Sequence, residues 1–514
     1  MHRLRAKLLF PKAKIPSLLF DNFVDMKNSH SYWSPLMFYF QLSALLTLFV
    51  MVIFLTHYPQ DKKDSSLPVY IEPPLNALRE PILKNPATAF LGDSSHEQPF
   101  HPYILNMAEM GGNQLLGNVT TRIQGMTCFN SGTDFQRSLS TCVCLQGFHG
   151  HHCSIPSSIF QNHQSGKDRQ EAPAHGLPAC LITTLLSFLE SDRFLLRTHP
   201  KRIIMGMVLN HELEMLEVRI RQLHHVVDIF VIQESNITTG GDAKKLVILN
   251  AMRRGFLEEF HWKILYVYLD HFPTGFIEDG WKADGYLRQH MSAQSLSRVQ
   301  GDNGDDLFLS FDADEIPNPE AVDFLRWHDG YPEPFVFNLV WTLYGFYWRM
   351  PSSFVTQKAL TSIVGGSSIQ FLNKFADRDV FKLRSRAYAH QTFYTPQPPL
   401  QIGSTSNPGG FHCSWCFSPA GIRVKLLSAQ RADRPRWGDF PDKTRISYIH
   451  NLVRTGTWFD GSRTAFNHIR FEGQSNFAPP FIMANQKRYQ HLLRHPDEWN
   501  ATEHWHSPFD KSFL

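Results

Sequence analysis

The chain has 514 residues, enough for one large domain or two to three ordinary ones. Its formal net charge is +3 at neutral pH, and 19% of its residues are charged, with no arginine-rich run or basic stripe. This balance excludes a nucleic-acid-binding protein of the usual basic kind, so we expect no nucleic-acid partner.

The longest apolar run covers residues 36–58 and is long enough to cross a hydrocarbon core of about 30 Å as a helix. The segment before it carries six Lys and Arg residues against two Asp residues, which favours a cytoplasmic location for residues 1–35. A cleaved signal peptide would have a shorter apolar centre and a small-residue cleavage site. We therefore expect a single-pass type II anchor at 36–58, with the rest of the chain in a lumen or outside the cell.

Three N-glycosylation sequons begin at Asn118, Asn236 and Asn500. All three follow the expected anchor, as a lumenal or extracellular location requires. From residue 59 to about 125 the chain is rich in Pro, Asn, Ser and Gln without sustained periodicity, which predicts a flexible stem.

Four cysteines, Cys128, Cys142, Cys144 and Cys153, lie close together after the stem. The spacing C-x-C-x-x-G-F-x-G-x-x-C resembles the C-terminal half of an EGF-like module, a small disulfide-bonded unit of oxidising compartments. The resemblance implies a truncated module in which Cys144 pairs with Cys153 and Cys128 with Cys142. A zinc site is the alternative for clustered cysteines.

Apolar runs alternate with amphipathic segments from about residue 201. Strands alternating with helices predict βαβ units and a largely parallel sheet that is covered on both faces. Ligands of such sheets bind beyond the carboxyl ends of the strands. The strands are predicted at 202–210, 226–235, 262–270 and 305–315, and the helices at 211–226 and 284–299.

The stretch LFLSFDADEIPNP, residues 307–319, has three acids, Asp312, Asp314 and Glu315, at the end of an apolar strand. Charge is costly there unless it is paired or bound to a metal. Alternation along a strand would send residues 312 and 314 to one side, where their carboxylates repel unless a cation lies between them. Mn²⁺ or Mg²⁺ shared with substrate phosphate oxygens fits this pattern. The alternative is an acidic strand end that caps the next helix.

The combination of anchor, stem, βα units and D-x-D-E before a proline resembles a type II Golgi glycosyltransferase with the nucleotide-sugar-binding, or GT-A, fold. Segments such as LNHELEMLEVRIRQL, DGWKADGYLR, FHCSWCFSPAGIRVKLLSAQ and VRTGTWFDG are similar to glycosyltransferase family 17 over roughly residues 140–495. We therefore expect an α/β protein with a GT-A-like fold on a membrane-anchored stem with a truncated EGF-like module. The expected layout is a cytoplasmic tail at 1–35, an anchor at 36–58, a stem at 59–125, the module at 126–156, a linker at 157–200, the catalytic domain at 201–497 and a tail at 498–514.

The resemblance implies transfer of N-acetylglucosamine from UDP-N-acetylglucosamine, in β-1,4 linkage, to the core β-mannose of N-glycans on glycoproteins in the Golgi lumen. Asp312 and Asp314 would bind Mn²⁺, or Mg²⁺, together with the donor diphosphate. A β product from an α-linked donor means inversion, which needs a base to take the proton of the acceptor hydroxyl. The candidates for the base are Glu315, Asp439, Asp442 and Asp460.

Several further residues could serve the same site. In this fold class a histidine from a later segment often completes the metal shell, so His412 is either a third ligand or a hydrogen-bonded structural histidine. Arg288 and Lys282 either meet the donor phosphates or are ordinary helix-surface cations.

Aromatic side chains are core residues or sugar platforms, and we expect one or two of them to touch the acceptor. They are Trp341, Tyr344, Tyr347, Trp348, Trp415, Trp437 and Trp458.

The remaining cysteines leave two questions open. Cys413 and Cys416 form a local disulfide or remain as two buried thiols in an oxidising lumen. Cys180 is a candidate for an intermolecular bridge, and a homo-oligomer is possible.

Three alternative interpretations of the sequence stay open. LSFDADEI also resembles the first motif of haloacid-dehalogenase-type phosphatases, but that motif opens its domain, whereas here about a hundred residues of βα structure precede it. A second rival is an adhesion or binding protein that acts through its EGF-like module. A third is a family member with another acceptor or without activity.

Overall fold

The computed structural model describes residues 105–106, 115–163, 194–351, 360–385, 398–429, 436–464 and 466–498. The expected cytoplasmic tail and anchor, most of the stem, Cys180 and Asn500 lie outside these residues. No helix in the described ranges is long and apolar enough to cross a membrane.

One half of the main sheet is parallel, with the spatial order β11, β7, β8, β9. The register pairs Ile204 with Ile229, and Phe230 with Ile264. Each strand lies within a range that the sequence predicts, so the parallel βαβ arrangement is confirmed here. The strands are β7 (Ile203–Val208), β8 (Ile229–Ser235), β9 (Ile264–Leu269) and β11 (Leu307–Ser310).

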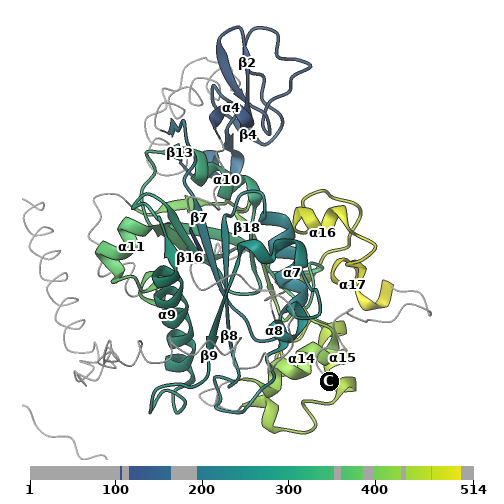
Figure 1. The fold of residues 1–514 in the computed structure, drawn as a ribbon. Helices are drawn as coiled ribbons and strands as arrows, with labels where there is room; N and C mark the ends of the chain where they lie inside the picture. The colour runs from purple at the N-terminus through teal and green to yellow at the C-terminus, as the bar shows by residue number, and fades with distance from the viewer. Residues whose placement is uncertain are drawn as a thin grey trace, which may run out of the picture. The chain divides into compact units, whose positions relative to one another are not determined.

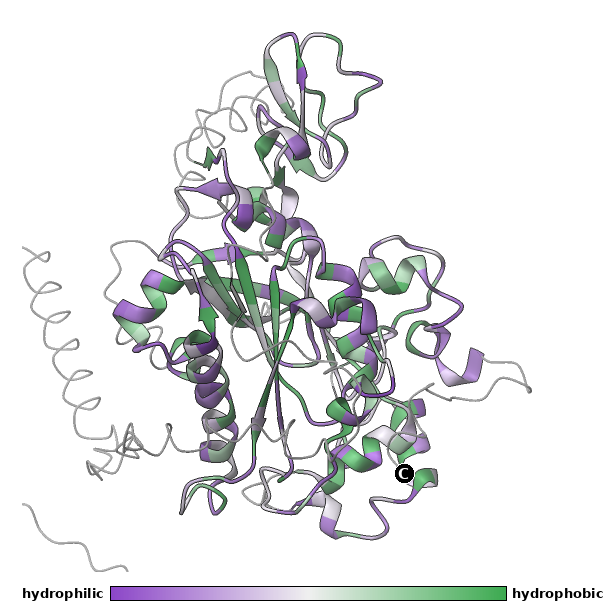
Figure 2. Ribbon diagram, in the orientation of Figure 1, coloured by the Kyte–Doolittle hydropathy of each residue, from purple (hydrophilic) through white to green (hydrophobic). Residues whose placement is uncertain are grey.

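Helices cover both faces of this half (Figure 1). Met205 of β7 packs in the same cluster as Leu216 of α7, whereas the adjacent Ile204 packs with Met291 of α9. Burial on both faces explains why these strands are continuous apolar runs, and Figure 2 shows them as hydrophobic at the centre of the molecule. The two helices are α7 (Leu213–Leu223) and α9 (Gly280–Arg298).

The other half of the sheet is mostly antiparallel, which corrects the prediction of a largely parallel sheet. Strand β16 runs antiparallel to both β11 and β14, so it joins the two halves, and the order continues through β18 to β12. The predicted strands end at residue 315, and the antiparallel strands follow it; β14 alternates buried and half-buried positions and lacks the fully buried run of the parallel strands. The strands are β14 (Phe335–Leu343), β16 (Leu360–Ser368), β18 (Gly410–Ser414) and β12 (Glu315–Pro317).

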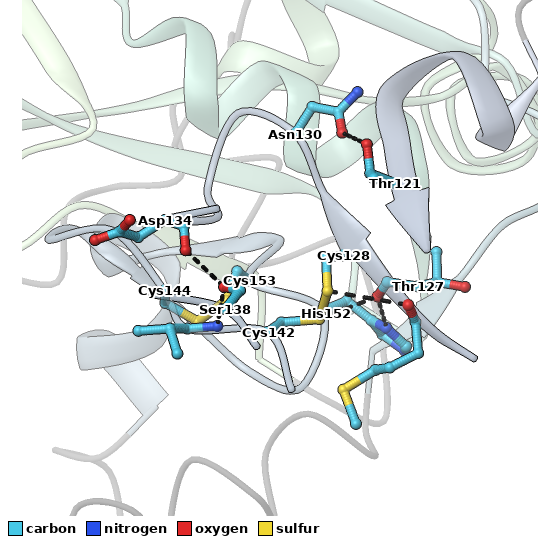
Figure 3. The surroundings of a disulfide bond; sticks show 12 residues. Thr121, Thr127, Cys128, Asn130, Asp134, Ser138, Cys142, Cys144, His152 and Cys153 are labelled. Carbon is cyan, nitrogen blue, oxygen red and sulfur yellow. Dashed lines mark hydrogen bonds between the residues drawn. A yellow bond between two sulfur atoms is a disulfide. The ribbon is translucent and has the colours of Figure 1, made fainter. Parts of the chain in front are cut away.

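The cysteine module contains two small hairpins, β2 with β3 and β4 with β5. Its disulfides join Cys128 to Cys142 and Cys144 to Cys153, the pairing that the EGF-like resemblance implies (Figure 3). The module is attached to the sheet domain by Ser154, whose hydroxyl lies 2.9 Å from Nε2 of His328. The strands are β2 (Thr120–Ile123), β3 (Met126–Phe129), β4 (Phe148–His149) and β5 (Ile155–Pro156).

Ordered structure extends beyond both predicted boundaries of the module. Strand β2 begins at Thr120, inside the expected stem, and α5 (Ser157–His163) occupies the start of the expected linker. The other helices are α4 (Leu116–Val119), α8 (Val247–Met252), η4 (Glu258–Lys263), α10 (Pro319–Trp327), α11 (Ile369–Ala376), α12 (Val380–Arg384), α14 (Pro419–Leu427), η5 (Trp437–Asp439), α15 (Ile446–Thr455), α16 (Pro480–Ala484), α17 (Gln490–Leu493) and η6 (Pro496–Glu498). The other short strands are β1 (Leu105–Asn106), β6 (Leu195–Leu196), β10 (Val299–Gln300), β13 (His328–Asp329), β15 (Trp348–Arg349), β17 (Leu400–Ile402) and β19 (Asn467–His468).

Candidate active site

The three acids lie in a turn between two strands. Strand β11 ends at Ser310 and β12 begins at Glu315, so the predicted strand at 305–315 is too long. The N–H of Glu315 donates to the carbonyl of Asp312 (3.1 Å), and the N–H of Asp312 donates to the Glu315 carboxylate (2.7 Å). These bonds close the turn, so strand alternation does not apply to Asp312 and Asp314, and their carboxylates have different partners.

Asp312 contacts two arginines. Its Oδ1 lies 2.7 Å from Nη2 of Arg288 on α9, and its Oδ2 lies 3.4 Å from Nη2 of Arg384 on α12. Burial alone would raise the pKa of Asp312, but the two guanidinium groups outweigh it and lower the pKa to about 2. Asp312 is therefore ionised throughout the physiological range.

Close packing of two helices makes this arrangement possible. A Cβ atom at Gly285 of α9 would lie 2.8 Å from the ring of Phe381 on α12, so only glycine fits there. The side chain of Asp379 accepts the N–H of Phe381 and starts α12. Arg384, at the end of this short helix, thus approaches the same carboxylate as Arg288.

Asp314 contacts a different pair of cationic groups. Its Oδ1 lies 3.6 Å from Nε2 of His412 on β18, and its Oδ2 lies 3.7 Å from Nζ of Lys425 on α14. Strand β18 places His412 opposite Glu315 in the antiparallel register, and the N–H of Cys413 donates to the carbonyl of Asp314 (2.8 Å). Burial raises the pKa of Asp314, but the positive groups of His412 and Lys425 lower it well below its usual range.

Glu315 is buried and points to Arg384. Both of its carboxylate oxygens lie 3.0 Å from Nη2 of Arg384, and one of them also accepts the N–H of Asp312. Both oxygens are thus engaged by groups that hold the turn together, and the carboxylate stabilises the turn. Its surroundings therefore favour a positioning role over the role of base that the sequence suggested.

A cavity of about 410 Å³ lies over Asp312 and Asp314, a volume typical of small-molecule sites. It opens at the carboxyl ends of β7, β8 and β11, where the sequence predicts a ligand site. Its wall also includes Asn210, Glu212, Ser235, Thr238, Lys244, Asp284, Arg288, His412, Trp415, Lys425, Trp437 and Phe459.

Two of the three expected metal ligands are adjacent. Two ligands that each lie about 2.1 Å from one ion are about 3 to 3.4 Å apart, close to the 3.6 Å between Asp314 Oδ1 and His412 Nε2. The buried Nδ1 of His412 has no hydrogen-bond partner within the described residues, which argues against a purely structural histidine. Asp312 instead contacts Arg288, and no three His, Cys, Asp or Glu side chains in the described ranges lie in a metal-binding arrangement.

Other predicted residues fall into two groups. Arg288 lines the cavity, but Lys282 does not; its ammonium lies 3.9 Å from Asp279 at the start of α9. The alternative bases, Asp439, Asp442 and Asp460, also lie outside the cavity wall. Asp439 and Asp442 pair with Arg436 and Lys443, and Asp460 accepts the N–H of Ser462.

Two of the predicted aromatic platforms, Trp415 and Trp437, line the cavity. The rings of Trp341 and His412 are nearly parallel, and their centroids lie 6.2 Å apart. Tyr344 and Tyr347 are fully buried in the core. Trp348 and Trp458 are half-buried and pack against the same core cluster.

The cysteines and sequons near the cavity are also placed. Cys413 and Cys416 form a disulfide, one of the two states that the sequence left open. Asn118 is exposed, as a glycosylation site requires. Asn236 is half-buried beside the cavity and its amide oxygen is fully buried, which disfavours a glycan there.

Arg384, Lys425 and Glu212 are among the residues of the site that the sequence did not indicate. Arg384 and Lys425 are helical cations, which are usually solvated, so nothing local marked them as partners of the acids. Glu212 follows β7 and could have been found from its place at a strand end, as Asp312 was. Its Oε2 accepts the N–H groups of Asn210 (2.6 Å) and His211 (2.9 Å).

Comparison with known proteins gives a consistent set of matches. Residues 187–359 match the model of glycosyltransferase family 17. The chain is 35% identical over 373 residues to proteins named β-1,4-mannosyl-glycoprotein 4-β-N-acetylglucosaminyltransferase from Rattus norvegicus and Homo sapiens. These alignments cover 71% of this chain and 63% and 64% of the two relatives, so the chain spans less than two thirds of their length.

Proposed function

Because residues 187–359 of this chain belong to glycosyltransferase family 17, we propose that the protein transfers N-acetylglucosamine from UDP-N-acetylglucosamine to the core β-mannose of N-glycans, in β-1,4 linkage. The observation that carries the proposal is the pair of acids at the mouth of the cavity, with Arg288, His412 and Lys425 around them. The names of the relatives support the donor sugar, the acceptor and the linkage.

The parallel half of the sheet would bind the donor, as in GT-A folds. Asn210, Ser235 and Thr238 follow the carboxyl ends of β7 and β8 and line the cavity beside Lys244. Lys425 lies next to Asp314, where it can contact an oxygen of the diphosphate. The cavity thus combines neutral polar groups for a nucleoside with cations for its phosphates.

Asp314 and His412, with Asp312 beside them, would bind Mn²⁺ or Mg²⁺. A bound divalent cation would neutralise charge that develops on the departing UDP. The carboxylate of Asp312 contacts both Arg288 and Arg384, and of these two arginines Arg288 lines the cavity, where it would contact the donor phosphates.

Glu212 is the best-placed base for the acceptor hydroxyl. Four carboxylates line the cavity, and three of them, Asp284, Asp312 and Asp314, pair with cationic groups. Glu212 has no Lys, Arg or His within ion-pair distance in the described residues. Because its carboxylate is not held in an ion pair, Glu212 would take the proton of the mannose hydroxyl as that oxygen attacks the anomeric carbon and the bond to UDP breaks.

The acceptor would bind on the aromatic side of the cavity. Trp415 packs against Phe459, with ring centroids 4.9 Å apart, and both line the cavity with Trp437. Aromatic faces of this kind suit the apolar face of a sugar ring.

We further propose that the chain is a type II membrane protein of the Golgi and that its catalytic domain lies in the lumen. That the protein forms a homo-oligomer stays a prediction.

The test is an assay of the purified protein with several UDP-sugars, Mn²⁺ and a biantennary N-glycan, followed by mass measurement and linkage mapping. We expect one N-acetylglucosamine at the 4-position of the core mannose. Asp314→Asn should lower the rate by about 100-fold or more, because a ligand of the cation that would stabilise the leaving UDP is lost. Asp305→Asn, at an exposed acid paired with Arg197, is the control and should keep the rate. Transfer of a different sugar, or of none, would refute the proposal.

A further inference from the structure

Arg219, in the middle of α7, is a fully buried cation in an unusual environment. Its exposed fraction is 0%, and in the described residues no carboxylate lies within ion-pair distance of it. Burial lowers the pKa of Arg219 to about 10, even though Glu315, Asp314 and Asp312 raise it from a distance. A buried charge without a direct counter-ion is costly, so the contacts that Arg219 does make need an explanation.

The hydrogen bonds of Arg219 are all with backbone carbonyls of residues 311–315, which we call the acid turn. Nη2 of Arg219 donates to the carbonyls of Asp312, Ala313 (3.1 Å) and Glu315, and Nη1 lies 3.5 Å from the carbonyl of Phe311. The carbonyls of Asp312 and Asp314 already accept the backbone N–H groups of Glu315 and Cys413. Those of Phe311 and Ala313 accept no backbone N–H in the part of the chain that the structure describes, and the guanidinium of Arg219 is their partner.

Arg384 fixes the same turn through different atoms. Its Nη1 donates to the carbonyl of Ser310 (2.6 Å), and its Nη2 contacts the carboxylate of Glu315. Glu315 in turn accepts the N–H of Asp312. The two arginines therefore fix the turn from its carbonyls and from its carboxylates.

We propose that Arg219 is a positioning residue that sets where the carboxylates of Asp312 and Asp314 face the cavity. The inference rests on the proposed function and names a residue that determines the geometry of that site. Arg219 is absent from the cavity wall, so it acts only through the turn. A lysine cannot replace it, because a single ammonium cannot reproduce the planar fork that reaches several carbonyls.

Arg326 offers a matched control. It is equally buried, and it also donates to a backbone carbonyl, that of Val226 (2.9 Å). Unlike Arg219, it has a direct counter-ion, Asp228, at 2.6 Å. Asp228 precedes β8 at the amino ends of the parallel strands, whereas residues 311–314 follow the carboxyl end of β11. Arg→Lys at either position removes a buried guanidinium, but only the change at 219 alters the turn.

The experiment measures UDP affinity by calorimetry, with and without Mn²⁺, and thermal unfolding for the wild type, Arg219→Lys, Arg219→Gln and Arg326→Lys. We expect all three variants to unfold at lower temperature. At a temperature where all are folded, Arg219→Lys and Arg219→Gln should weaken Mn²⁺-dependent UDP binding by about tenfold or more, and Arg326→Lys should not. UDP affinity without Mn²⁺ should stay within about twofold of the wild type in every variant, because the cations that line the cavity are unchanged.

Three outcomes would overturn the role of Arg219. The first is wild-type affinity in both Arg219 variants, and the second is an equal loss in Arg326→Lys. The third is failure of both Arg219 variants to fold while Arg326→Lys folds, since Arg219 would then be structural. If the wild type itself shows no Mn²⁺-dependent UDP binding, the proposed function fails, and this result is distinct from the other three.

Discussion

The two halves of the main sheet contribute different charged groups to the same site. The parallel half ends in the acids, with Asp312 and Asp314 after β11 and Glu212 after β7. The antiparallel half and its helices supply His412 on β18 and Lys425 on α14. Asp312 has Arg288 of the parallel half beside it, whereas Asp314 has His412 and Lys425 of the antiparallel half, so the charge balance of the site depends on both halves.

One strand, β16, connects the two halves of the sheet and so relates the charged groups of one half to those of the other. Strand β16 pairs with β11 on one side and β14 on the other, so it connects the strand before the acids to the strand beside His412. The acids and their cations are therefore fixed by one continuous hydrogen-bonded sheet.

The largest effect should come from the parallel half, at Glu212. Glu212→Gln keeps the size of the side chain and removes the basic carboxylate, so we expect kcat to fall by about 100-fold or more. Donor KM should change little, because in the proposed site the phosphates would contact Arg288 and Lys425 and not Glu212. Steady-state kinetics with UDP-N-acetylglucosamine check this.

Glu212→Asp provides the matched control, since it retains a carboxylate and should recover part of the lost rate. A Glu212→Gln enzyme with wild-type kcat would remove Glu212 from the chemistry. The parallel half would then contribute binding residues alone.

A smaller effect should appear in stability, at Asp314. Without Mn²⁺, Asp314→Asn leaves His412 and Lys425 without their counter-charge, so we expect a loss of about 1–3 kcal/mol in the free energy of unfolding. Calorimetric unfolding in a metal-free buffer measures it. A rise in Tm would mean that repulsion between the acids outweighs their attraction to the cations, and the charge balance between the halves would be wrong.

The sequence predicted the parallel half well and the antiparallel half poorly, for a physical reason. Strands buried on both faces form continuous apolar runs, so β7, β8 and β9 are visible without a structure. The partners of the acids are visible only in three dimensions. Arg384 and Lys425 have ordinary helical surroundings in the sequence, and only the packing of α12 and α14 brings them to Asp312 and Asp314.

The turn itself was predicted only in part. The sequence correctly placed the acids at the end of β11. The predicted strand included residues 312 and 314, whereas the structure has them in the turn between β11 and β12. Arg219 lies about ninety residues earlier, in an amphipathic helix, and its contact with the carbonyls of Ala313 and Glu315 has no signature in the sequence. Long-range side-chain to backbone bonds of this kind are what a local pattern cannot show.

The most direct measurement of the central claim, that Asp314 and His412 from the two halves bind one cation with the donor diphosphate, is UDP affinity for the wild type and Asp314→Asn with and without Mn²⁺. The effect of Asp314→Asn on UDP affinity should differ between the two conditions. With Mn²⁺, Asp314→Asn should bind UDP about tenfold or more weakly, because a ligand of the cation is lost. With a chelator present, the variant should bind UDP at least as tightly as the wild type, because a negative charge has been removed beside the phosphates. An equal loss of affinity in both conditions, or no loss with Mn²⁺, would contradict it.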